Sequence, residues 1–81
     1  MTKQEAIELV EKYLSKHKPK GYRLHVMPKA SRREDDWWYI CVQPDRENIR
    51  RYDYYDILAQ VERELEDEEQ VNIALFPVAA T

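Results

Sequence analysis

The sequence predicts a small α+β domain whose elements follow the order helix, strand, strand, helix, strand (αββαβ). Residues 2–17 and 53–68 carry apolar side chains at three- and four-residue spacing, which is typical of amphipathic helices. Residues 22–27, 36–43 and 71–76 alternate in polarity or concentrate β-branched and aromatic residues, as strands do. Because each helix has one apolar stripe and each strand one aliphatic face, we expect a two-layer sandwich with both helices on one face of a three-stranded sheet.

The first helix has a clear start and a clear end. Thr2 and Glu5 have the spacing of a capping box, in which each side chain binds a free backbone amide at the helix start. Pro19 prevents continuation of the helix, and Gly21 allows the chain to reverse. The stripe expected to face the core consists of Ala6, Ile7, Val10, Tyr13, Leu14 and His17.

The strand at 36–43 has two non-polar faces, although a domain of this size buries only one face fully. Its neighbour at 22–27 alternates more clearly, and Leu24 and Val26 indicate the core side. The predicted core side of the sheet therefore contains Leu24, Val26, Trp38, Ile40 and Val42. Residues 29–35 are polar and lack a tight-turn signal, so we expect a flexible connection there.

The second helix is expected to begin at Asp53, a favourable N-cap, and to fray at its acidic carboxyl end. Its apolar stripe consists of Tyr54, Ile57, Leu58, Val61 and Leu65. Residues 43–69 form a long crossover suited to skipping a strand, which favours an all-antiparallel sheet of order 2-1-3. In the alternative, the third strand lies beside the second, and the sheet is mixed.

Composition limits the possible functions of residues 1–81, which we expect to form a single domain. Charged residues make up 36% of the chain and hydrophobic residues 43%, too many hydrophobics for a disordered tail. The net charge of −3 combines +6 in residues 1–33 with −9 in residues 34–81. One cysteine and two histidines give no disulfide and no zinc cage, so we expect no metal and no cofactor. Without a signal peptide or an apolar span, we expect a cytoplasmic protein that does not enter a membrane.

The sheet face opposite the helices is the candidate functional surface, because aromatic residues on it have no expected cover. An exposed apolar patch of several hundred Å² usually marks an interaction site. The sequence therefore predicts a protein interface that binds either a second copy or another protein. The predicted interaction face consists of Arg23, His25, Met27, Trp37, Tyr39, Cys41 and Phe76.

Two alternatives for this face remain open. Trp37 and Tyr39 could stack on unpaired bases of single-stranded RNA or DNA. The side chains that could then reach phosphates are Arg23, Lys29, Arg32 and Arg33. In the other alternative, the 29–35 connection or residues 77–81 fold over the face and enlarge the core.

Catalysis has little support in the sequence. His25 and Cys41 could share the uncovered face, and a Cys–His pair is the minimum for a thiol nucleophile. No orienting group or oxyanion hole accompanies them, so we expect a non-enzymatic protein. The arginine- and tyrosine-rich residues 50–56 could bind an anion at a helix start, but packing of the tyrosines is the simpler interpretation.

In element order the chain resembles small αββαβ domains of the KH-like type, several of which bind RNA. That resemblance implies an α+β fold and would favour the nucleic-acid alternative. The glycine-rich clamp that carries KH function is absent, because Gly21 is the only glycine. No functional residue is therefore carried over from that group.

Overall fold

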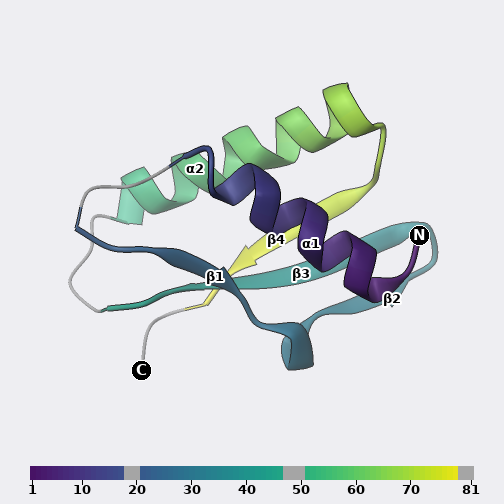
Figure 1. Cartoon of the computed structure of the whole chain (residues 1–81), viewed down its shortest axis with the longest axis horizontal. Coiled ribbons are helices and arrows are strands. Elements are labelled where there is room, and N and C mark those ends of the chain that lie inside the picture. The colour runs from purple at the N-terminus through teal and green to yellow at the C-terminus, as the bar shows by residue number, and fades with distance from the viewer. Residues whose placement is uncertain (18–20, 47–50, 79–81) are drawn as a thin grey trace.

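The computed structural model describes residues 1–17, 21–46 and 51–78 as two helices packed on one face of a sheet (Figure 1). The α+β two-layer architecture predicted from the sequence is confirmed. In chain order the elements are α1 (Lys3–Leu14), β1 (Leu24–Val26), a 3₁₀ turn (Pro28–Ala30), β2 (Arg32–Glu34), β3 (Trp37–Pro44), α2 (Arg51–Glu64), a π-helical turn (Leu65–Glu69) and β4 (Ile73–Pro77). The predicted capping box of α1 is present, with Thr2 and Glu5 bonding each other's backbone amides.

The central strand of the sheet is β3. β1 and β2 pair with it antiparallel, and β4 pairs with it parallel. Trp38 and Val42 each have a partner in β4 and another in β1 or β2. Since a strand has two edges, β1 and β2 must follow one another along the edge opposite β4.

The favoured all-antiparallel order 2-1-3 is therefore wrong, and the mixed sheet is the observed arrangement. The physical reason lies in the crossover. A helix that runs back along the sheet returns the chain to the end of the sheet at which β3 began. The strand that follows can then lie directly beside β3 and parallel to it, so α2 is sufficient to connect the two strands. The length of residues 43–69 does not require a strand to be skipped.

Residues 29–35, which were expected to form a flexible connection, are ordered and contain the end of the 3₁₀ turn and all of β2. β2 turns into β3 through Asp35 and Asp36, and Asp35 has a positive φ of 54°. Between β1 and β2, the buried Ser31 replaces the missing backbone partner of the ladder. Its hydroxyl donates to the Met27 carbonyl at 2.8 Å and accepts from the Cys41 amide at 3.1 Å. The side chain thus continues the hydrogen bonding across the 3₁₀ turn.

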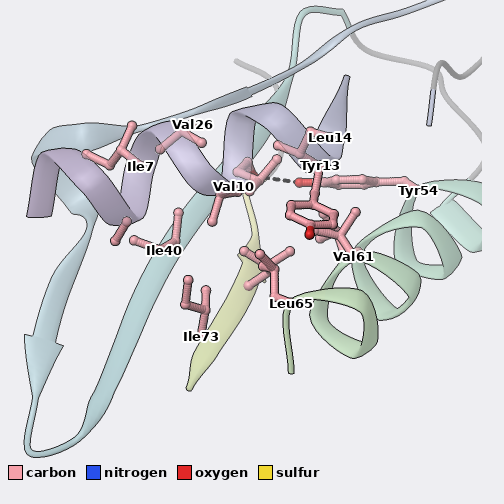
Figure 2. Packing of buried hydrophobic residues seen from close by; sticks show 14 residues of the cluster. Ile7, Val10, Tyr13, Leu14, Val26, Ile40, Tyr54, Val61, Leu65 and Ile73 are labelled. Carbon is pink, nitrogen blue, oxygen red and sulfur yellow. Dashed lines mark hydrogen bonds between the residues drawn. The ribbon is translucent and has the colours of Figure 1, made fainter. Parts of the chain in front are cut away.

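The core lies between the helices and the helix-facing side of the sheet, as Figure 2 shows. Ile40 and Val42 of β3 are fully enclosed by apolar residues of both helices. Three residues expected to be buried are only half-buried at its margin: Leu24, Trp38 and Ile57. Trp38 lies near the hairpin end of β3, where the Arg33 guanidinium covers its ring at 5.7 Å from the centroid.

The two ends of α2 differ from the sequence-based expectation. The helix begins at Arg51, so Asp53 lies in its first turn and is not the N-cap. The acidic end does not fray but continues as the π-helical turn, which closes at Gln70 in the left-handed region. The Tyr13 hydroxyl donates to Glu69 Oε2 at 2.6 Å, and a 2.6 Å hydrogen bond joins His17 Nε2 to Glu64 Oε1. These bonds to α1 and the residues that follow it stabilise an end that the helix dipole alone would destabilise.

Tyr54 connects α2 by hydrogen bonds to the carboxyl-terminal ends of β3 and β4. Its buried hydroxyl donates to the Val42 carbonyl at 2.6 Å and accepts from the Val78 amide at 3.1 Å. The same Val78 amide donates to Val42 at 2.8 Å, so helix and both strands meet at one point. Burial of the hydroxyl raises the pKa of Tyr54 to about 12, because the phenolate would lose its hydration.

We expect Ile40→Ala to lower the free energy of unfolding by about 2–5 kcal/mol, because it leaves a cavity in the fully enclosed core. Urea unfolding followed by circular dichroism measures the change. Cys41→Ala is the matched control one residue along the same strand, on the opposite face, and should cost no more than about 1 kcal/mol. Equal losses in the two variants would contradict the assignment of the faces.

We expect stability to fall as the pH rises from 10 towards 12. A tyrosine ionises near pH 10 in the unfolded chain, and the pKa of folded Tyr54 is about 12. The neutral hydroxyl therefore contributes its full stability below pH 10 and loses it as the pH passes through the folded pKa. Hydrogen bonding to Glu69 also raises the pKa of Tyr13 to about 12. Tyr54→Phe should be less stable at pH 8 and should show a shallower alkaline decline in urea unfolding; an unchanged decline would contradict the role of Tyr54.

Candidate interaction surface

The helix-free side of the sheet carries an aromatic patch. Since Trp38, Ile40 and Val42 face the helices, the intervening residues of β3 face away from them. The strand registers then fix which residues of the other strands accompany them. We call this surface the open face; it consists of His25, Arg32, Glu34, Trp37, Tyr39, Cys41, Gln43, Ala74 and Phe76.

Three aromatic residues dominate the open face. Trp37 is 44% exposed and Phe76 is 45% exposed, while Tyr39 is half-buried between neighbouring strands. The rings of Tyr39 and Phe76 lie 5.5 Å apart at an interplanar angle of 34°. Such a tilted pair fixes the rings in position without removing them from solvent. The aromatic members of the predicted interaction face therefore lie together, as the alternation in the sequence indicated.

The remaining predicted members lie along β1 and its ends. His25 pairs with Gln43 across the strands and is exposed. Arg23 shares its side by alternation, and the Arg23 amide donates to Asp45 Oδ1 at 2.9 Å. Met27 is half-buried, and its amide bonds the Cys41 carbonyl at 2.8 Å. Arg23 and Met27 thus extend the open face beyond β1.

The residues proposed as phosphate contacts do not gather on one side. Arg32 lies opposite Tyr39 on the open face, where its Nη2 is 3.6 Å from Glu34 Oε1. Arg33 lies on the other side of the sheet, over Trp38, and its Nε donates to the Asp35 carbonyl at 3.1 Å. Lys29 is exposed in the 3₁₀ turn. Adjacent residues of a strand point to opposite faces, so the grouping of Arg32 with Arg33 was wrong once this segment proved to be a strand.

Residues 32–34 do not fold over the open face, because β2 lies beside β3 as part of the sheet, and the 3₁₀ turn contacts that face at Cys41 without burying its own residues. The alternative in which the 29–35 segment enlarges the core is therefore wrong. Residues 79–81 of the tail lie outside the described residues, as does Arg50 of the suggested anion cluster.

Catalytic or metal chemistry finds no assembled site in the residues that the structure describes. The Cys41 thiol donates to the Ala30 carbonyl at 3.5 Å, and no hydrogen bond joins it to His25 within these residues. His17 is bonded to Glu64 at 2.6 Å. Across residues 1–17, 21–46 and 51–78, no group of three or more histidine, cysteine or acidic side chains is placed to hold a metal ion. None of the helices in these ranges combines the length and apolarity needed to cross a bilayer.

Comparison of the chain with protein-family models, with curated proteins and with solved structures gives no match. The function is therefore inferred from the residues of the chain itself.

We expect the two adjacent tryptophans to differ in their access to solvent. Trp38→Phe leaves Trp37 as the only tryptophan, and its fluorescence should be quenched strongly by acrylamide at low protein concentration. Trp37→Phe leaves Trp38, which the core and Arg33 shield, and its fluorescence should be quenched less. Equal quenching in the two variants would contradict the exposure of the open face.

Proposed function

We propose that this chain is a non-enzymatic binding domain that associates through its open face, with a second copy of itself as the principal partner. The exposed aromatic patch of Trp37, Tyr39 and Phe76 carries this proposal. Tryptophan and tyrosine are enriched in protein interfaces, where their burial supplies much of the binding energy. Both helices pack on the other side of the sheet, and Trp37 and Phe76 keep 44% and 45% of their surface exposed.

The distribution of charge supports a second copy as the partner. A self-complementary interface must not repel itself, and on the open face Arg32 is accompanied by Glu34 at 3.6 Å. The exposed acidic run Glu66–Glu69 follows α2 in the helix layer. Layers pack about 10 Å apart, so face-to-face association would separate the two acidic layers by roughly 30 Å, well beyond the screening length of about 8–10 Å.

Binding of single-stranded nucleic acid has less support. Stacking platforms need nearby cations that reach the phosphates. Arg33 lies on the other side of the sheet, and Glu34 reduces the attraction that Arg32 offers. A protein partner fits this face better. We further propose a cytoplasmic location, since the only cysteine can form no disulfide within the chain.

We expect the chain to dimerise in solution and Trp37→Glu to weaken the dimer without unfolding it. Loss of a buried aromatic anchor typically costs about 2 kcal/mol or more, which is roughly thirtyfold in the dissociation constant. Sedimentation equilibrium over a concentration series measures the association, and circular dichroism verifies the fold. Tyr52→Glu is the matched control, because Tyr52 is 85% exposed on α2 in the helix layer, and it should leave the dimer unchanged.

Two outcomes would overturn the proposal. A monomer at several hundred micromolar would remove self-association. Saturable quenching of tryptophan fluorescence by a short single-stranded RNA, weakened by salt and lost in Trp37→Glu, would assign the open face to nucleic acid instead.

A further inference from the structure

One outer edge of the sheet, that of β1, has backbone amides and carbonyls without hydrogen-bond partners among the described residues. The hydrogen-bonding pattern of the strands shows which groups these are. On β4, the groups that bond β3 belong to the even-numbered residues, because Trp38 donates to the Asn72 carbonyl and Val78 donates to Val42. The odd-numbered residues therefore face outward. The Leu75 amide is occupied by Glu62 Oε2 at 2.9 Å, and Pro77 has no amide hydrogen. The outer edge of β4 is thus closed to another strand over most of its length.

The opposite edge is divided by the 3₁₀ turn into β2 and β1. In β2 only the central residue, Arg33, turns its backbone outward, and its side chain folds back to the Asp35 carbonyl. In β1 the outward residues are Leu24 and Val26, because Arg23 accepts from the Asp45 amide and Met27 donates to Cys41. Within the part of the chain that the structure describes, no hydrogen bond engages the outward amides and carbonyls of Leu24 and Val26.

A groove of about 660 Å³ lies at the amino-terminal end of this edge, between residues 21–25 and the carboxyl-terminal half of α1, with Asp45 and Arg46 beside it. Leu14, Tyr22 and Leu24 give it an apolar lining. Its volume falls within the range of about 300–1,000 Å³ that is usual for ligand sites. The unpaired strand edge points to an extended backbone as the occupant, and the groove beside Leu24 has room for side chains of such a strand.

A strand that paired with the outer edge of β1 would meet different charges on its two faces. On the open-face side, cross-strand neighbours would be Arg23 and His25, which favour a carboxylate. On the helix side, neighbours would be Leu14 and Leu24, and the exposed Glu11 disfavours a carboxylate there. Asp45 is already engaged, by the Arg23 amide at 2.9 Å and by Arg46 Nε at 3.8 Å.

We infer that an extended peptide of alternating apolar and acidic residues adds as an antiparallel strand to the outer edge of β1. Its apolar side chains lie against the groove lining, and its carboxylates lie beside Arg23 and His25. In an antiparallel pair, residues opposite Leu24 and Val26 share their face and exchange both hydrogen bonds with them. The apolar residues of the peptide therefore supply the bonded amides, while the amides of its acidic residues point away.

The test uses the full chain and the acetylated, amidated peptide Glu-Val-Glu-Val-Glu, followed by two-dimensional NMR. We expect saturable shifts of the Leu24 and Val26 amides and slower hydrogen exchange at both. N-methylation of the valines removes the bonded amides and should weaken binding at least about tenfold, as loss of two hydrogen bonds implies. N-methylation of the glutamates should have little effect, and this peptide is the matched control.

Two further measurements make the inference specific. Exchanging the glutamates of the peptide for lysines should abolish binding, and His25→Glu should restore part of it. The Trp37→Glu variant should bind the peptide as the unaltered chain does, because Trp37 does not line the groove; this separates the groove from the aromatic patch, although His25 belongs to the open face as well. Tolerance of both N-methylated peptides, or shifts confined to Trp37 and Tyr39, would overturn the inference.

Discussion

The structure depends on a single strand that is hydrogen-bonded along both edges. β3 holds β1 and β2 on one side and β4 on the other, and its side chains divide the molecule into a helix layer and an open face. A one-residue shift in the register of β3 would move Ile40 and Val42 out of the core and would move Tyr39 and Cys41 into it. The buried aliphatic residues thus fix the register, and the register in turn fixes the aromatic patch.

Local spacing was sufficient for the two helices, for β1, β3 and β4 and for their faces, because burial acts on each side chain separately. It missed β2, so the expected three-stranded sheet has four strands. Val10 and Val61 lie where helical periodicity put them, and the aliphatic residues of β3 face the helices. The order of the strands could not be predicted from the same spacing. Alternation shows which face of a strand is buried, but it does not show which neighbouring strand lies along each of its edges. The edge that β4 occupies is joined to α2 by the Tyr54 hydroxyl and by Glu62, contacts between residues well separated along the chain.

The candidate surface was predictable where it depends on alternation alone. Trp37, Tyr39 and Cys41 had to share a face once 36–43 was assigned as a strand. Arg33 was misplaced because residues 29–35 lack the usual turn residues, although Asp35 adopts the positive φ that a tight hairpin requires. The role of Ser31 had no signal in the sequence, since a serine in a polar segment more often bonds to water than completes a ladder.

The parallel pairing of β3 with β4 has a consequence for synthesis and truncation. The hairpin, α1 and α2 are all synthesised before residues 73–77, and without those residues one edge of β3 lacks its partner. A chain that stops short of Ile73 also loses Leu75, one of the residues that close the core beneath α2. Such a fragment exposes a β-branched and aromatic strand edge of the kind that recruits other chains. We therefore expect a chain that lacks β4 to be prone to aggregation, whereas the chain with β4 has both edges of β3 paired.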